Sequence, residues 1–394
     1  MKLLISLFIV QCTTILLSLF NLVSRKTMIN VLRFSYGFFL IFSGFVKILD
    51  PLGFSYKLQE YFEVFGLEWM NELTLFMSIF ICALEIALGV FLIYGLFVKL
   101  VLQVNLLLMI SFTFLTFYSA YFNVVTDCGC FGDFMKLEPW FSFQKDIIFL
   151  IVSCFLLFFY KTIYPISNTN FLYRSLIVVF FVIFFVPIYG LSHLPIVDFR
   201  AYSVGSNILE GLMLPEDAQK DEYEDIWYYE IDGVVKTFST SENPWKIDGA
   251  KFVDRETKLV KKGDEPLIKD FDIISDETKL DLTDSILSLD KVLLFISYDI
   301  EKTNVKAHTK INNNTLDLLE SVGVPVFGLS SSSISDVKKV LSKKTLDFLY
   351  LSVDQTTLKT IIRSNPGLIM LENGVVTNKW HWRDIPEDWS IYVK

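Results

Sequence analysis

The amino-terminal half of the chain contains six apolar stretches, and each is long enough to cross a lipid bilayer. A spanning helix needs about 20 apolar residues. Inside a bilayer the backbone has no water to bond, so such stretches fold as helices. The six stretches are 3–23, 31–49, 74–97, 100–122, 146–164 and 175–194. They predict an α-helical membrane bundle with five to six spans.

The sequence changes character near Pro195. Hydrophobic residues make up 53% of the whole chain, which includes 38 Phe, but this apolar excess ends there. Residues 197–394 are polar and acidic, and a soluble part of about 200 residues is long enough to bury its own core. The net charge of −9 argues against nucleic acid as a partner, because nucleic acid binds to basic surfaces.

The charges in the connecting links predict how the bundle is oriented. Arg25, Lys26, Lys99 and Arg174 lie in or beside three short links, and such cations favour the cytoplasmic side. The links 24–30, 98–99 and 165–174 are therefore predicted to be cytoplasmic, and the links 50–73 and 123–145 and everything after residue 195 to lie outside. We expect a multi-pass protein of a bacterial inner membrane, in contact with the lipid bilayer. Its carboxy-terminal domain would be periplasmic and would meet periplasmic or envelope proteins.

The first stretch admits more than one interpretation. Residues 1–27 could form an extra span or anchor, or a signal peptide, although no small-x-small cleavage site follows. A start at Met28 would leave five spans. We favour a true span.

Two of the five cysteines lie one glycine apart in the run Thr126–Asp133, TDCGCFGD. Cys128 and Cys130 can approach each other only in a tight bend, and Gly129 and Gly132 can take the positive φ that such a bend requires. A redox-active pair, a structural staple and a metal site all remain open. Metal is the weakest of these, because no histidine lies nearby to complete the ligands. The flanking carboxylates of Asp127 and Asp133 are expected to raise the pKa of the thiols.

Charged residues also occur within or at the ends of the predicted spans. Glu85 lies in the middle of the third span, where an ionisable group is costly and is a candidate functional residue. Lys47 and Asp50 end the second span, and Lys47 could pair with Glu85 or Asp50, or extend towards solvent. Cys82 and Cys154 lie at similar depths in their spans and could form a second pair if the two helices touch.

The soluble half begins with a β-rich segment and ends with alternating strands and helices. Residues 226–240 have a hairpin pattern around Asp232–Gly233, an Asp-Gly turn signal. Strands are predicted at 291–299, 323–331 and 348–354, helices between and after them, and a final hairpin at 366–382 that turns at Asn373–Gly374.

Together these features resemble two known families. The first half resembles the DoxX/MauE-like membrane family through FSGFVKILDP (42–51), Glu85 and DCGCFGD (127–133), and the second half looks like a TlpA-like thioredoxin-fold domain. The resemblance implies four parts: 1–27 as an extra span or anchor, 28–195 as the membrane domain, 196–290 as a β-rich periplasmic preamble and 291–394 as a thioredoxin-like domain. It also places Pro366 where thioredoxin folds keep a cis-proline.

The sequence departs from the thioredoxin pattern where the reactive cysteines should be. That place reads YDIEKTN (298–304), and the soluble half contains no cysteine. We therefore weigh two functions. In the first, Cys128 and Cys130 form the catalytic pair of a thiol–disulfide oxidoreductase component, a quinone is a candidate acceptor, and Lys47, Asp50, Glu85 and Pro366 are candidate binding residues. In the second, the protein is a non-catalytic scaffold that binds partners of an envelope assembly or secretion complex.

Overall fold

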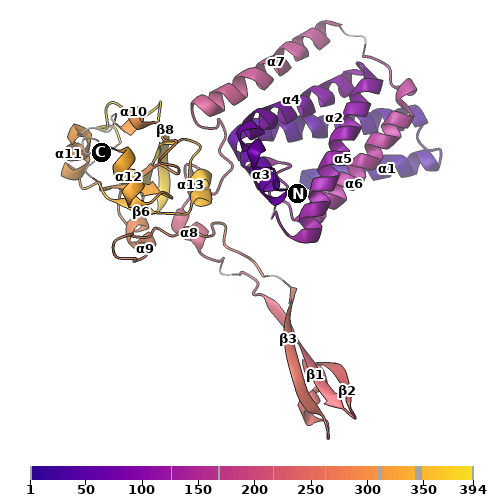
Figure 1. The fold of residues 1–394 in the computed structure, drawn as a ribbon. Coiled ribbons are helices and arrows are strands. Elements are labelled where there is room, and N and C mark those ends of the chain that lie inside the picture. Colours follow the sequence, from indigo (N-terminus) through magenta and orange to yellow (C-terminus); the bar gives the residue numbers. More distant parts are fainter. Residues whose placement is uncertain are drawn as a thin grey trace.

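The computed structural model describes residues 2–125, 127–166, 169–215, 217–261, 263–308, 310, 313–341 and 348–392. Figure 1 shows three parts: a helical bundle, a small sheet that stands apart from it, and a mixed helix–sheet domain that contains the last described residues. The helix–sheet domain is called the C-terminal domain below.

The bundle contains five helices that are long and apolar enough to cross a membrane, counted over the described residues. Its helices are α1 (Lys2–Leu19), α2 (Arg25–Ile48), α3 (Pro51–Val64), α4 (Thr74–Tyr94), α5 (Val98–Phe122), α6 (Pro139–Phe158) and α7 (Thr169–Ser192), with a 3-10 turn at Glu68–Leu73 before α4. The described part of α1 that is apolar, Ser6–Leu19, is shorter than a span, so the sixth span over 3–23 stays a prediction. The chain is a multi-pass membrane protein.

Small residues bring α2 and α4 close together. A Cβ placed on Gly89 would lie 2.5 Å from the carbonyl oxygen of Gly37, and one on Gly44 would lie 2.8 Å from that of Cys82. In a membrane, helices associate mainly by such close packing, because lipid supplies no hydrophobic drive between them. Ser43 and Gly44 therefore lie on the side of α2 that faces α4.

Helix α3 covers one end of the bundle. Asp50 caps its first turn by accepting a hydrogen bond from the Gly53 N–H at 3.0 Å, and Pro51 occupies the first helical position, where its missing N–H costs nothing. Phe54, Leu58 and Tyr61 are buried. Phe54 and Leu58 pack with residues of α2 and α4, which holds α3 against the bundle.

The C-terminal domain is built on a five-stranded sheet in the order β6-β5-β4-β7-β8. Its strands are β4 (Val292–Ile296), β5 (Val326–Ser330), β6 (Tyr350–Ser352), β7 (Gly367–Glu372) and β8 (Val375–His381). Strands β4, β5 and β6 are parallel, whereas β7 and β8 are antiparallel. The predicted turn at Asn373–Gly374 is confirmed, since both residues have positive φ.

Helices and outlying segments complete this domain. Between the strands lie α10 (Val305–His308), α11 (Asn313–Ser321), α12 (Ile334–Val340) and α13 (Gln355–Ile361), and α8 (Ile208–Leu212) and α9 (Thr283–Leu287) precede them. Tyr202, Ile208, Phe271 and Ile286 pack into the same core as β4. The core of the C-terminal domain therefore draws on residues that precede position 291.

The remaining sheet is a three-stranded antiparallel unit in the order β2-β1-β3. Its strands are β1 (Glu222–Ile231), β2 (Val234–Ser239) and β3 (Lys251–Lys261). The predicted hairpin at Asp232–Gly233 is confirmed, with φ of 53° and 76° at its two turn residues. Figure 1 shows this sheet extending away from α8, outside the other two parts.

Candidate functional site

The two cysteines that lie one glycine apart are in a turn between α5 and α6, called the thiol loop here (residues 127–134). Gly129 and Gly132 have φ of 63° and 52°, as the sequence predicts for a tight bend. The Ser43 hydroxyl of α2 donates to the carbonyl oxygen of Cys130 at 3.0 Å, and Phe131 is 1% exposed. These contacts hold the thiol loop against the end of the bundle.

The two thiols are free, half-buried and unequal. The Cys130 backbone N–H lies 3.3 Å from the Cys128 sulfur. The hydrogen bond from the Cys130 thiol, reinforced by the nearby Lys145 ammonium, lowers the pKa of Cys128 to about 7 although burial opposes this. The same hydrogen bond, together with burial, raises the pKa of Cys130. Of the two thiols, Cys128 is therefore the one that loses its proton more readily.

The flanking carboxylates of Asp127 and Asp133 affect the thiol pKa values less than the sequence predicts, because each carboxylate is paired with a cation. Asp127 lies 3.2 Å from the Lys57 ammonium of α3, and Asp133 lies 3.0 Å from the Arg363 guanidinium. An opposite charge at this distance offsets the field that a carboxylate exerts on its neighbours. The prediction of a raised pKa at both thiols is therefore wrong for Cys128.

A buried ion pair lies in the bundle beside the thiol loop. The Lys47 ammonium is 2.7 Å from a carboxylate oxygen of Glu85, and the two side chains are 1% and 2% exposed. The Ser43 hydroxyl also lies 3.2 Å from Glu85, and the ammonium sits 4.9 Å from the centre of the Phe54 ring. Of the partners predicted for Lys47, the structure selects Glu85 and not Asp50.

A second buried ion pair joins Lys145 and Asp146 at the start of α6, where the two side chains are 2% and 1% exposed. The Thr116 hydroxyl donates to Asp146 at 3.0 Å, and the Lys145 ammonium lies 5.7 Å from the Phe131 ring of the thiol loop. Sequence reasoning missed this pair because it began the span at residue 146. Adjacent opposite charges bordering an apolar run were the available signal.

Arg363 of the C-terminal domain pairs with two carboxylates of the bundle. Arg363 is 4% exposed and lies 2.8 Å from Asp50 and 3.0 Å from Asp133. Burial alone would lower the pKa of Arg363, but the two carboxylates outweigh it and raise the pKa. Arg363 and Arg200 in turn lower the pKa of Asp50 against the effect of its burial. No sequence motif marks Arg363, so this residue was also missed.

Aromatic contacts extend the junction. The Arg363 guanidinium lies 5.3 Å from the Tyr56 ring of α3, and the Tyr56 hydroxyl lies 3.5 Å from that of Tyr298. Tyr298 follows β4, where the predicted thioredoxin pattern would place its reactive residues. This end of the C-terminal domain therefore faces the bundle.

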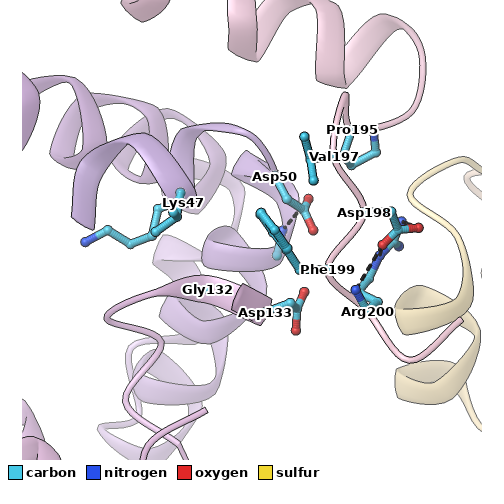
Figure 2. A pocket seen from close by; sticks show the side chains of 11 residues that line it. Lys47, Asp50, Gly132, Asp133, Pro195, Val197, Asp198, Phe199 and Arg200 are labelled. Carbon is cyan, nitrogen blue, oxygen red and sulfur yellow. Dashed lines mark hydrogen bonds and ion pairs between the residues drawn. The ribbon is translucent and has the colours of Figure 1, made fainter. Parts of the chain in front are cut away.

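A small cavity lies at the same junction, with about 10 Å³ of space, roughly enough for one water. Figure 2 shows Asp50 and Asp133 near it, with Asp198 and Arg200 across from them and the Lys47 side chain directed away. Asp198 pairs with Arg200 at 2.6 Å and with Lys379 at 2.7 Å. Lys47 and Asp50 thus belong to different environments, one inside the bundle and one at the junction.

Pro366 lies directly beside the segment after β4. The Asn365–Pro366 peptide bond is cis, as the resemblance implies. The Asn365 side chain donates to the Asp299 carbonyl at 2.7 Å, and the Asn304 N–H donates to the Asn365 carbonyl at 3.1 Å. The loop that carries Pro366 and the segment 298–304 are therefore one surface, and Arg363 connects that surface to the thiol loop.

The remaining cysteines do not form a second pair. Cys82 is fully buried where α4 meets α2, whereas Cys154 is exposed on α6, and both are free. The described residues contain no group of three or more His, Cys, Asp or Glu side chains placed to hold a metal ion.

A known protein family matches most of the helical bundle. Residues 25–159 match the family of methylamine utilisation protein MauE. The membrane part is MauE-like. Residues 223–262, which cover the three-stranded sheet, match a domain of unknown function, DUF8463. No curated protein matches the chain. The MauE-like region includes α2, α4, α5, α6 and the thiol loop. It therefore contains Cys128 and Cys130 and both buried ion pairs.

Proposed function

We propose that this membrane protein carries out thiol–disulfide exchange through Cys128 and Cys130. The observation that carries the proposal is the asymmetry of the pair: the Cys128 pKa is lowered to about 7 while that of Cys130 is raised. A pair with one activated thiol and one resolving thiol suits exchange through a mixed disulfide. A structural staple has no need of such a difference.

In the direction that oxidises a client, the pair starts as a disulfide. A client thiolate attacks the Cys128 sulfur, the Cys128–Cys130 bond breaks, and Cys130 leaves and takes up a proton. The second client thiolate then attacks the client sulfur of the mixed disulfide, and Cys128 leaves as a thiolate. The client gains a disulfide, and two electrons pass to Cys128 and Cys130. A pKa of about 7 at Cys128 favours its release near neutral pH.

The reduced pair must then be reoxidised. We propose a quinone, or the disulfide of another membrane protein, as the acceptor of two electrons and two protons. Tyr61 of α3 is suited to face such an acceptor, because burial and the nearby thiols raise the pKa of its hydroxyl and keep it protonated. Lys145, next to the thiols, would hold a negative charge as it develops.

We assign client presentation to the C-terminal domain, which has no cysteine of its own. Its central parallel strand, the neighbouring antiparallel hairpin and the position of Pro366 support a thioredoxin-like fold. The Pro366 surface and the thiol loop both contact Arg363, so a client held at the former would lie near Cys128. The link charges support a periplasmic location for both. The name of the matching family connects MauE with methylamine utilisation, and we propose that the client is likewise a protein in need of redox maturation.

A scaffold function is the second candidate. It is favoured by one observation: the segment 298–304 lacks cysteine and already contacts the bundle through Tyr298 and Tyr56. In that case the thiol pair would only brace its loop.

Trapping distinguishes the two. Exchange is reversible, so in Cys130→Ser the Cys128 thiolate attacks the disulfide of an oxidised client and one client sulfur leaves as a thiolate. Because Cys130 is no longer present to displace the client from Cys128, the client should accumulate as a mixed disulfide that disappears on reduction. Cys154→Ser, which removes an exposed thiol outside the loop, is the matched control and should trap nothing. Cells in which Cys128 and Cys130 are both replaced by Ser should lose oxidation of the trapped client. If that double variant keeps full function and Cys130→Ser forms no adduct, thiol exchange is excluded and the scaffold function is supported.

A further inference from the structure

The three-stranded sheet β1–β3 has two chemically different faces. Residues that oppose each other in an antiparallel register point to the same face. Trp227 lies opposite Phe238 and Arg255, and Tyr229 lies opposite Lys236 and Phe252. These residues form what we call the aromatic face, together with Tyr223, Leu259 and Trp245, whose ring lies 5.6 Å from that of Trp227. Only part of this face is covered, by the segment between β2 and β3: Trp227 donates to the Thr240 hydroxyl at 2.9 Å and Tyr229 is 7% exposed.

The aromatic face is exposed to an unusual degree. Tyr223, Phe252 and Trp245 are 61%, 57% and 48% exposed, and Leu259 is 48% exposed. Contiguous apolar exposure of this kind marks an interaction site, because a water-facing sheet normally keeps its large apolar side chains on a covered face. Such exposure is typical of a surface that binds a partner.

Charge is distributed unequally between the two faces. The aromatic face carries the cations Arg255 and Lys236 and a single strand carboxylate, Asp225, which lies 3.9 Å from Arg255. The opposite face carries five carboxylates against three lysines. These are Glu222, Glu224, Glu230, Asp254 and Glu256, with Lys251, Lys258 and Lys261. The aromatic face is thus complementary to an anionic partner, and the other face would be repelled by one.

We propose that the aromatic face docks on the lipid surface of the membrane that the bundle spans, against anionic headgroups. Tryptophan and tyrosine concentrate where hydrocarbon meets headgroups, since their rings are apolar and their N–H or O–H groups are polar. Cations beside them pair with lipid phosphates. The bilayer is also within reach, because five helices of the same chain are apolar enough to cross it. A second copy fits less well, since two such faces would bring Arg255 and Lys236 of each copy together.

Photocrosslinking in the full chain tests this directly. The photoreactive amino acid benzoylphenylalanine replaces Phe252 on the aromatic face or, as the matched control, Val235 on the opposite face, where Val235 is 53% exposed. The protein is placed in nanodiscs of phosphatidylcholine with about 30% phosphatidylglycerol, and these lipids are the probe. Both lipids carry a fluorescent group on the acyl tail, so that a lipid adduct can be detected. We expect at least fivefold more lipid adduct at position 252 than at position 235.

Two further arms separate the alternatives. Discs of phosphatidylcholine alone, and the variant Arg255→Glu in mixed discs, should each reduce the adduct at position 252 severalfold. Equal adducts at the two positions would overturn the proposal, as would a protein–protein crosslink at position 252 in place of lipid. The test is independent of thiol exchange, because it leaves Cys128 and Cys130 unchanged.

Discussion

The bundle and the C-terminal domain meet at Arg363, and they contribute different kinds of residue to the junction. The bundle brings two thiols and, beside them, two ion pairs whose side chains are at most 2% exposed. The C-terminal domain brings a guanidinium, an aromatic ring and a loop with a cis peptide bond, but no cysteine. At 298–304, where the resemblance predicts reactive residues, the Tyr298 hydroxyl instead lies 3.5 Å from that of Tyr56.

If the proposed function is correct, reactivity and recognition lie in different domains of this chain. A charge is costly to bury, and it is retained in a bundle only when it is paired. The bundle carries that cost beside the thiol loop, whereas the C-terminal domain has an ordinary apolar core around β4. Substitutions at three positions test this contrast between the bundle and the C-terminal domain.

The largest effect is expected from Glu85→Gln. The variant leaves the Lys47 ammonium buried without a counter-charge, which costs about 3–5 kcal/mol. Thermal unfolding in detergent should show a large fall in the midpoint. Glu60→Gln is the control, because it removes only a half-exposed partner of Lys57 and should cost about 0.5 kcal/mol or less. Equal midpoints for the two variants would mean that the buried pair does not support the bundle.

A smaller effect is expected from Arg363→Met, which removes both ion pairs at the junction. Each hydrogen bond to a charged partner contributes about 1.5–3 kcal/mol, partly offset by the water that reaches Asp50 and Asp133. The C-terminal domain should undock, and an impermeant thiol reagent should label Cys128 severalfold faster.

Lys359→Met serves as the control for this variant. Lys359 lies 4.9 Å from the Tyr56 ring and forms only a cation–π contact, of about 0.5–1 kcal/mol. Unchanged labelling in Arg363→Met would show that the domain does not cover the thiol loop.

The smallest effect concerns the pH dependence of Cys128. With Cys12, Cys82 and Cys154 replaced by Ala, its alkylation rate should rise with pH with a midpoint near 7, because only the thiolate reacts. Removing the Cys130 thiol as Cys130→Ala raises the Cys128 pKa, so the midpoint moves up and the rate at pH 7 falls about tenfold. Cys130→Ser keeps a hydroxyl donor and should shift the midpoint less. A midpoint that does not respond to either change would contradict the assigned hydrogen bond.

Much of the bundle could be predicted because bilayer thickness and backbone hydrogen bonding leave few choices. The apolar runs match the five candidate spans, with ends that differ by up to about seven residues, and Gly129 and Gly132 give the bend of the thiol loop. The extra span at 3–23 stays a prediction, because apolar length alone does not separate a short helix from one that crosses the membrane. The turns at Asp232–Gly233 and Asn373–Gly374 followed from local backbone preferences.

The candidate site was only partly predictable, because its decisive contacts join residues far apart in the chain. Lys47 and Glu85 could be proposed as partners, since both are charges in apolar surroundings. The link from Asp133 to Arg363 spans 230 positions, and no local pattern marks either end. The pKa of Cys128 was misjudged for the same reason: neighbours in sequence, Asp127 and Asp133, were counted, while Lys145 and Lys57 were not.

The bridge made by Arg363 also has a consequence for the order of assembly. Asp50 and Asp133 lie in the part of the chain that a ribosome produces first, and the guanidinium that joins them arrives more than 200 residues later. Until then, two carboxylates near each other at the end of the helices repel, so the newly made bundle should remain loose there. Completion of the last domain would tighten it, and truncation before residue 363 should leave the amino-terminal half more easily degraded.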